Sequence, residues 1–202
     1  MDALLQGYRR FRASVWPERR DLFEALARDG QAPRALVIAC ADSRVDPAMI
    51  FGAAPGEIFT IRNVASLVPP YQPDAAYHGT SAALEFGVRV LEVRDIIVMG
   101  HGMCGGIRAL LRDPEGLRGD FIAGWMALAA PARQRVLACT DPVAQEEACG
   151  FEAIKLSLDH LRGFPWIAER MAEGRLRLHG ASFDIRTGLL LLLGEDGAFT
   201  PA

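Results

Sequence analysis

The chain has 202 residues, of which half are hydrophobic and 23% are charged, and its formal net charge is −3. This length and composition fit one folded domain spanning residues 1–202 with a buried core, and they exclude a disordered chain. The small negative charge, with no basic run between aromatic residues, gives no indication of a nucleic-acid partner, and we expect none. The longest apolar run near the C-terminus, 189–193, is too short to span a bilayer, and the N-terminus lacks an apolar signal core. We therefore expect no membrane association and a cytoplasmic location.

Residues 1–30 are expected to form a helical arm ahead of the first strand. Apolar residues recur there at helical spacing, which predicts one or two amphipathic helices. The arm has too little apolar surface to fold alone, so we expect it to pack on the domain or on a second subunit. Its apolar positions are Phe11, Val15, Leu22, Phe23 and Leu26.

The rest of the chain alternates between strand and helix patterns. Short apolar runs predict strands at 35–39, 57–61, 95–99, 176–185 and 189–193, the last two joined as a hairpin at Thr-Gly. Helical spacing predicts helices over 78–93, from 107, over 146–161, and from Pro165 to near Gly174. This order predicts an α/β fold with a mostly parallel central sheet, an antiparallel edge strand and helices on both faces. Ligands of such sheets gather at the carboxyl ends of the strands.

Two short motifs at predicted strand ends carry reactive side chains. Cys40 begins CADSR directly after the strand 35–39, and His101 and Cys104 belong to HGMC, after the strand 95–99. Because the carboxyl ends of parallel strands meet at one edge of a sheet, we expect the three side chains to converge. Two cysteines and one histidine with an open fourth position are a known ligand set for catalytic zinc. The sequence therefore predicts one Zn2+ per chain, held by Cys40, His101 and Cys104.

Asp42 and Arg44 belong to the same segment as Cys40 and are expected to support the metal. Two thiolates neutralise the divalent ion, so it acidifies water less than it would with three neutral histidines. Arg44 can hold Asp42 in a bidentate pair and keep it ionised. Asp42 can then orient zinc-bound hydroxide for attack, and it is kept from occupying the open position on zinc. This predicts Asp42 and Arg44 as a catalytic dyad.

Each of these residues also has an ordinary structural interpretation. A cysteine at the end of an apolar strand is most often a buried thiol, and His101 alone could be a satisfied loop histidine. Asp42 could cap a turn, and Arg44 could form a surface ion pair. The metal site would be wrong only if all four ordinary interpretations were correct at the same time. This requirement favours the zinc interpretation. Cys139 and Cys149 have no histidine at ligand spacing, and we expect them to be free thiols.

The turn after the third strand also fits a dinucleotide-binding pattern. Residues 100–105 read GHGMCG, which satisfies G-x-G-x-x-G between a strand and a helix. The acidic residue expected about twenty positions later should end a second strand, whereas Asp120 precedes FIAGWMALAA, which is typical of a helix. A phosphatase-like anion loop built on Cys40 requires an arginine where Asp46 stands. Both alternatives fit less well than zinc.

Beyond these motifs, the sequence resembles the β-class carbonic anhydrases. The blocks CADSRVDP, PGEIFTIRNVASLVPPY, HGTSAALEFGV and DIIVMGHGMCGGIRALL are similar to blocks of that family and occur in its order. The resemblance runs from about Gln31 to Leu111, resumes more weakly from His179 to Gly188, and favours the plant-type branch. It implies reversible hydration of CO2 to bicarbonate and a proton on zinc. It also implies assembly as dimers or tetramers, with the active site near the subunit interface.

The resemblance implies roles for further residues. Gln31 corresponds to a hydrogen-bond donor to the substrate, and Phe59 and Val64 to positions that line the apolar CO2 pocket. Phe86 and Gly105 are further substrate-binding positions. Phe86 stands where the plant-type branch often has tyrosine, which removes one hydroxyl group.

A regulatory site of some family members is expected to be absent. Those bacterial members bind inhibitory bicarbonate through a Trp–Arg–Tyr trio, of which only the arginine, Arg62, is present here. The other two positions are Val37 and Phe183. We therefore expect an open site with water on zinc and with Asp42 off the metal.

Two other functions remain open from the sequence. A relative with the same fold could hydrolyse a CO2-like molecule such as carbon disulfide or carbonyl sulfide. The second possible function is that of a non-catalytic protein that binds zinc or senses bicarbonate. Asp42 and Arg44 argue against the latter, because structural zinc has four protein ligands and needs no dyad.

Overall fold

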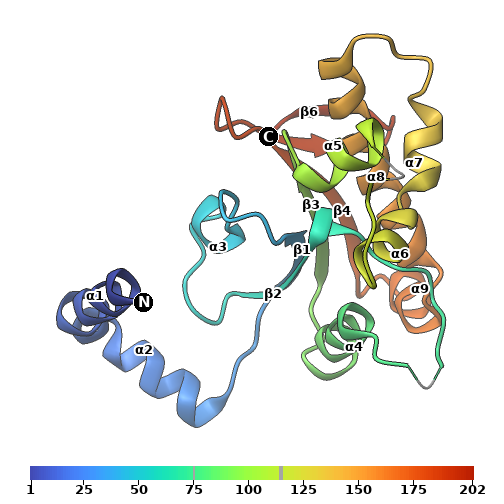
Figure 1. Ribbon diagram of the computed structural model, residues 1–202. Helices are drawn as coiled ribbons and strands as arrows, with labels where there is room; N and C mark the ends of the chain where they lie inside the picture. Colours follow the sequence, from blue (N-terminus) through green and yellow to red (C-terminus); the bar gives the residue numbers. More distant parts are fainter. Residues whose placement is uncertain (75, 114–115) are drawn as a thin grey trace.

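The computed structural model describes residues 1–74, 76–113 and 116–202, and a six-stranded sheet lies at the centre of this described part (Figure 1). The strand order is β2-β1-β3-β4-β5-β6. The pairs β2–β1, β1–β3 and β3–β4 are parallel, and β5 and β6 are added antiparallel. The predicted fold class is confirmed, with two antiparallel strands at the edge where the sequence predicted one. The strands are β1 Ala35–Cys40, β2 Ile58–Asn63, β3 Asp95–His101, β4 Arg177–Phe183, β5 Leu190–Leu193 and β6 Phe199–Pro201.

Strand β1 is apolar throughout because both of its faces are buried. Leu36 and Ile38 are fully buried in a core shared with Val88 and Ile154. Val37, on the other face, is also fully buried, next to Met99 of β3 and Ala181 of β4. The helix α3 (Pro47–Ile50) covers this second face in part, through Ile50.

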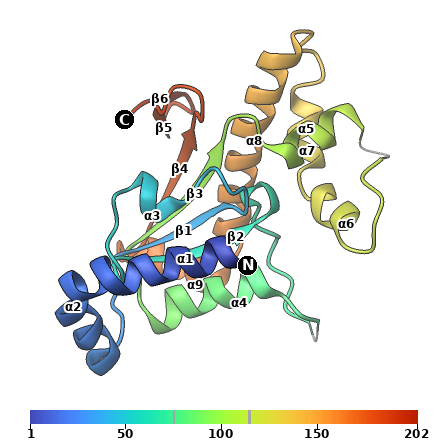
Figure 2. The ribbon, with the colours of Figure 1, turned by 60° about the vertical axis from the view of Figure 1, so that its left-hand side comes forward.

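Most of the helices pack on the first face or at the carboxyl end of the strands. The longest, α8 (Pro142–Arg162), packs against β3 and β4 and starts at Asp141, whose carboxylate accepts a hydrogen bond from the Val143 amide at 2.9 Å. Figure 2 shows α5, α6 and α7 grouped beside one end of α8. The other helices are α4 Gly79–Glu85, η3 Phe86–Val90, α5 Gly105–Arg112, α6 Ile122–Ala127, α7 Ala130–Arg135 and α9 Pro165–Ala172.

Several element boundaries differ from the sequence prediction. The helix predicted over 78–93 is divided into α4 and the π-helical turn η3, and it ends near Leu91. The short elements α3, α7 and β6 were not predicted, because three to six residues are too few to show a periodic pattern. Helix α8 begins four residues before the predicted start at Glu146.

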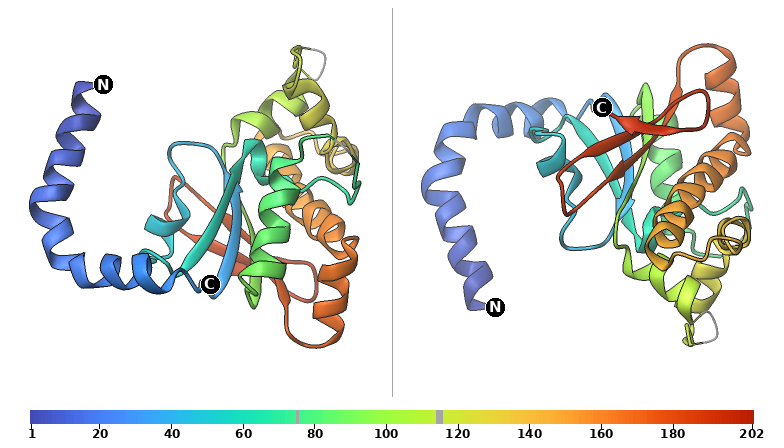
Figure 3. Two further views of the ribbon diagram at one scale, coloured as in Figure 1. Left: turned by 90° about the horizontal axis from the view of Figure 1, so that it is seen from below. Right: turned by 90° about the horizontal axis from the view of Figure 1, so that it is seen from above.

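The N-terminal arm is helical, as predicted, and projects away from the sheet (Figure 3). It consists of α1 (Asp2–Arg10), the π-helical η1 (Phe11–Val15) and α2 (Trp16–Asp29). These three segments bury no side chain, and Leu4 and Tyr8 are 76% and 58% exposed. In the described part of the chain, only the C-terminal end of the arm touches its own domain: a Cβ atom on Gly56 would lie 2.7 Å from Cδ2 of Leu26. Within the described residues, no helix is both long and apolar enough to cross a membrane.

Candidate metal centre

The three predicted zinc ligands meet at the carboxyl end of the sheet. Cys40 ends β1 and His101 ends the adjacent parallel strand β3, while Cys104 precedes the first residue of α5. Their ligand atoms all lie within 4.8 Å of one another, and all three residues are buried. Parallel pairing of β1 and β3 brings the two strand ends together, and the tight HGMC turn returns Cys104 to the same point.

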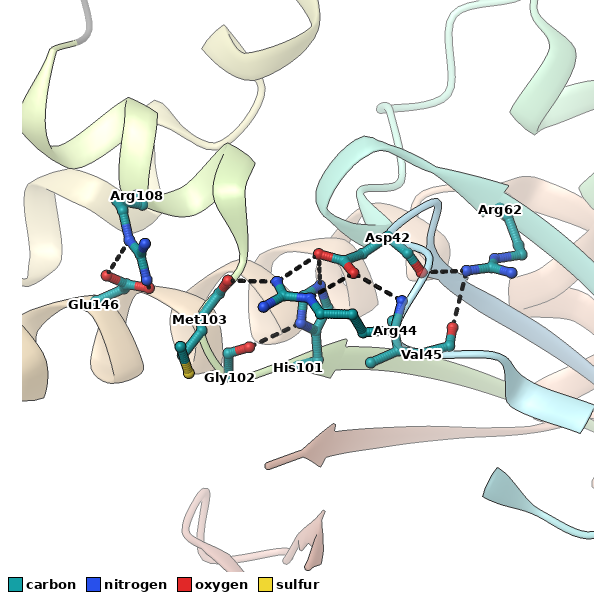
Figure 4. A network of polar contacts seen from close by, with 9 residues as sticks. All are labelled: Asp42, Arg44, Val45, Arg62, His101, Gly102, Met103, Arg108 and Glu146. Atoms are coloured by element: carbon teal, nitrogen blue, oxygen red, sulfur yellow. Dashed lines mark hydrogen bonds and ion pairs between the residues drawn. The ribbon is translucent and has the colours of Figure 1, made fainter. Parts of the chain in front are cut away.

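The imidazole of His101 is oriented as a metal ligand. Its Nδ1 lies 2.8 Å from the Gly102 carbonyl oxygen, an acceptor, so this nitrogen carries the proton (Figure 4). Nε2 then has a free lone pair, and it is buried with no hydrogen-bond partner among the described residues. Buried polar atoms are nearly always satisfied, so this unpartnered nitrogen facing two sulfur atoms fits a metal ion. The donor set is the Cys2His set of catalytic zinc sites.

The two thiol groups are electrostatically unequal. The hydrogen bond from Cys104, aided by His101 and the backbone amides of Asp42 and Ala65 and opposed by burial, lowers the pKa of Cys40 to about 4. The same hydrogen bond, together with burial, raises the pKa of Cys104. Cys40 is therefore the more easily ionised of the two thiols. A divalent cation bound here would stabilise both as thiolates.

Backbone amides at the start of α5 also face the sulfur of Cys104. The N–H groups of Gly106 and Ile107 act on this thiol in the direction that favours its thiolate form. Gly106 allows this close approach: a Cβ atom there would lie 3.1 Å from Cγ1 of Val64 and 3.4 Å from Cβ of Ala65. The glycine-rich turn thus serves the Cys–His–Cys group, and the structure gives no second strand ending in an acidic residue near Asp120 among the described residues.

Asp42 and Arg44 form a two-pronged ion pair beside this group. Arg44 donates from Nε to Oδ1 of Asp42 at 2.9 Å and from Nη2 to Oδ2 at 2.7 Å, and its backbone amide donates to Oδ1 at 3.0 Å. These bonds hold the pKa of Asp42 far below its usual range. Oδ2 also lies 3.9 Å from Nε2 of His101. The ionised carboxylate is thus fixed next to the place where a metal fits.

Arg62, the retained member of the regulatory trio, is engaged by residues 40–46, including an ion pair of 3.3 Å with Asp46. It donates to the carbonyl oxygens of Cys40, Asp42 and Val45 at 3.0, 2.6 and 2.9 Å. The other two trio positions, Val37 and Phe183, offer no hydrogen-bonding side chain. This positioning role of Arg62 was missed from the sequence, because only the register of β1 with β2, which pairs Ala39 with Arg62, makes it visible.

The remaining predicted substrate residues fall into two groups. Val64 follows β2 and Gly105 begins α5, so both lie at the metal end of the sheet. Phe59 stands four positions before Asn63, the partner of Cys40, and so roughly 13 Å from that end along the strand. Its ring packs 5.9 Å from that of Phe86. Gln31 precedes β1 at the opposite end. A single chain therefore does not bring Gln31, Phe59 and Phe86 to the metal group.

A cavity of about 230 Å3 gives access to the metal group from the side of α5 and α8. His101, Cys104, Arg108 and Glu146 are among the residues that line it. Arg108 donates to the two carboxylate oxygens of Glu146 at 3.0 and 3.1 Å, which joins α5 to α8. This ion pair, 38 residues apart in the chain, was not visible in the sequence.

A parallel sheet whose strand ends hold a buried Cys–His–Cys group defines a class of metal-binding α/β protein. Residues 35–190 match the family model described as carbonic anhydrase. The chain belongs to the carbonic anhydrase family, and its relatives place it in the β class.

The similar curated proteins come from plants and bacteria. β-Carbonic anhydrase 5, chloroplastic, and β-carbonic anhydrase 3, both of Arabidopsis thaliana, are 40% and 35% identical over 91% and 100% of this chain. A carbonic anhydrase of Pseudomonas aeruginosa is 38% identical over 98% of it. The chain spans 61% of the length of the first relative, 80% of the second and 89% of the third.

Solved structures agree with this assignment. The β-carbonic anhydrase CcaA has a TM-score of 0.93 at 35% identity, with 100% of this chain and 99% of that chain covered. One of two tetrameric β-carbonic anhydrases from Sordaria macrospora has a TM-score of 0.85 at 30% identity, with 98% of each chain covered.

Proposed function

We propose that this protein is a zinc-dependent carbonic anhydrase that interconverts CO2 and bicarbonate. The observation that carries the proposal is the buried Cys40–His101–Cys104 group with the ionised Asp42 carboxylate 3.9 Å from its histidine nitrogen. A purely structural zinc site would have a fourth protein ligand and would not need a carboxylate held at this distance. Family membership supports the same conclusion.

Zinc held by Cys40, His101 and Cys104 would act as a Lewis acid that lowers the pKa of water and so supplies the nucleophile at neutral pH. Asp42, whose Oδ2 lies beside this group, would accept a hydrogen bond from that nucleophile and orient it toward CO2. Arg44 fixes both oxygens of Asp42, so the carboxylate stays ionised and is kept from moving onto the metal. Asp42 and Arg44 are already in place before the reaction begins, so no side chain has to move when the negative charge of Asp42 acts on the nucleophile.

Stopped-flow CO2 hydration by the zinc-loaded protein tests this mechanism. We expect Asp42→Asn, which keeps the shape of the side chain, to lose about a hundredfold or more in kcat/KM while retaining zinc. Asp159→Asn is the control, because Asp159 is also paired with an arginine but lies exposed on α8. Equal rates for Asp42→Asn and wild type, or activity unchanged by a zinc chelator, would refute the proposal. Parallel assays with carbon disulfide and carbonyl sulfide determine the preferred substrate.

We further propose that the active unit contains at least two chains. The arm leaves apolar side chains exposed, and Gln31, Phe59 and Phe86 lie away from the metal group of their own chain. A second copy packed on the arm and on the edge strand β2 can supply these residues to the site. The tetrameric Sordaria macrospora relative supports such assembly.

The apolar face of the arm provides the test of assembly. Leu4→Asp with Tyr8→Asp places two charges on that face without touching the sheet or the metal group. Analytical ultracentrifugation should show a shift toward monomers for this double variant and none for Glu18→Gln on the same arm. A double variant with the same mass distribution as wild type would contradict the proposed interface.

A further inference from the structure

A second polar basin lies at the end of the sheet opposite to the metal group. Strands β3 and β4 begin there, with Asp95 and Arg177, whereas β3 ends at His101. The basin has a volume of about 560 Å3. It is lined by Glu92, Arg94, Arg170, Gly174, Arg175 and Arg177, so four guanidinium groups face it together with one carboxylate.

Arg94 and Arg170 keep free hydrogen-bond donors in different ways. The side chain of Arg94 makes no ion pair or hydrogen bond with any residue that the structure describes. Arg170 is only 12% exposed at its side chain, and its Nη1 donates to the Val88 carbonyl at 2.9 Å and to Glu92 at 3.2 Å. Its Nε is buried without a partner among the described residues. An arginine held this firmly by the backbone, with donors left over, is preorganised to bind an acceptor.

The other two arginines are held in place by acidic neighbours outside the basin. Arg177 donates to both oxygens of Asp95 at 2.9 and 3.1 Å. Arg175 pairs with Glu173. Each pair uses Nε and Nη2 of the arginine, which leaves Nη1 for another acceptor. Glu92, Asp95 and Glu173, together with Glu169, which acts electrostatically on Arg175, match the four arginines in formal charge, so the basin offers free hydrogen-bond donors rather than net charge.

Backbone hydrogen bonds fix the spacing of these side chains. The amide of Arg177 donates to the carbonyl of Arg94 at 3.0 Å, and the amide of Arg175 donates to the carbonyl of Arg170 at 2.9 Å. Arg170 lies on α9 and Arg177 begins β4, while Arg94 directly precedes β3 and Arg175 lies in the short segment between α9 and β4. The free donors of the four side chains are thus held close together, where one bound anion can accept from several of them.

We propose that this basin binds a phosphate group, either as free phosphate or as a phosphate monoester. A tetrahedral dianion presents several oxygen atoms and can accept two parallel bonds from an arginine fork, whereas chloride has a single acceptor atom and half the charge. The site is separate from the metal centre and uses none of its residues. Phosphate binding there stabilises the folded chain by mass action.

Thermal unfolding of the zinc-loaded protein in increasing sodium phosphate, against sodium chloride of equal ionic strength, tests the proposal. The melting temperature should rise saturably with phosphate and not with chloride. Arg94→Gln should weaken the apparent affinity by about tenfold, the loss of one charge-assisted hydrogen bond. Arg162→Gln, an exposed arginine of α8 paired with Asp159, should respond like wild type. Adenosine monophosphate as a second probe shows whether a phosphate monoester is accepted.

Several outcomes would overturn the proposal. A phosphate response no larger than that of chloride would do so. An Arg94→Gln response equal to that of wild type would place any bound phosphate elsewhere, including at the zinc. CO2 hydration by Arg94→Gln should remain unchanged, which separates this proposal from the proposed function.

Discussion

Nη2 of Arg44 lies 3.1 Å from the backbone carbonyl oxygen of Met103, so the dyad arginine is tied to the turn that carries His101 and Cys104. Met103 has a φ of 58°, in the left-handed region that side chains with a Cβ rarely adopt. This conformation directs its carbonyl toward Arg44. The two halves of the candidate site, CADSR and HGMC, are therefore coupled through one backbone oxygen.

The left-handed conformation of Met103 predicts the effects of substitution there. This conformation costs a residue with a Cβ about 1–2 kcal/mol, and glycine avoids the cost while losing more backbone entropy on folding. We expect Met103→Gly to unfold at a denaturant concentration equal to or above that of wild type. Met103→Val, which is β-branched, should be destabilised by about 1 kcal/mol or more. Met49→Val, on the exposed surface of α3, is the control and should change little.

The two-pronged contact between Arg44 and Asp42 predicts that lysine cannot replace this arginine. A lysine ammonium cannot reach both oxygens of Asp42 and the Met103 carbonyl with a planar fork. We expect Arg44→Lys to retain zinc but to lose roughly tenfold or more in kcat/KM for CO2 hydration, because Asp42 is no longer held in position. Arg162→Lys on α8 should have wild-type activity. Full activity of Arg44→Lys would show that charge alone suffices.

The cysteines outside the metal group should react very differently with thiol reagents. Cys149 is fully buried, and burial raises its pKa to about 11, so it stays a protonated thiol at neutral pH. Cys139 is partly exposed. In the zinc-loaded protein we expect Cys139 to be labelled first, and Cys149 only after unfolding. Mass spectrometry of the labelled peptides checks this order, and rapid labelling of Cys149 in the native protein would contradict it.

Asp95 predicts a loss of stability in acid. Its partial burial raises its pKa, but hydrogen bonds from Arg177 and His179 outweigh this and hold the pKa below its ordinary value. The unfolded chain therefore binds more protons at this position. The stabilisation is fully present above the unfolded pKa of about 3.9 and is lost as the pH falls through the lower folded value.

We accordingly expect Asp95→Asn to lower the free energy of unfolding by about 1 kcal/mol near pH 7, with a smaller difference from wild type below about pH 4. Urea unfolding at the two pH values measures both quantities. Glu85→Gln removes an exposed ion pair with Arg89 on one helix and should have a small effect at either pH. A difference independent of pH would show that Asp95 acts through packing instead.

Local sequence patterns determined the main elements of this protein. The apolar run that became β1 predicted a strand buried on both faces, and the spacing of apolar residues along α8 predicted a helix. Cys40, His101 and Cys104 were identifiable because each follows a strand end, and parallel strands end at the same edge. Short elements such as α3 and β6 were not predictable, because their formation depends on contacts made elsewhere in the chain.

Only the tertiary structure decided the relationships between distant residues. Register alone places Arg62 under the CADSR segment, and the backbone geometry of Met103 alone directs its carbonyl to Arg44. The same holds for the arginine basin, whose members come from α9, from the first residue of β4 and from the segments that precede β3 and β4. The zinc ligands could be predicted from the sequence because only a few residue types bind zinc, and these stood at predicted strand ends. Positioning contacts use any backbone carbonyl and any arginine within reach, so only the folded chain reveals them.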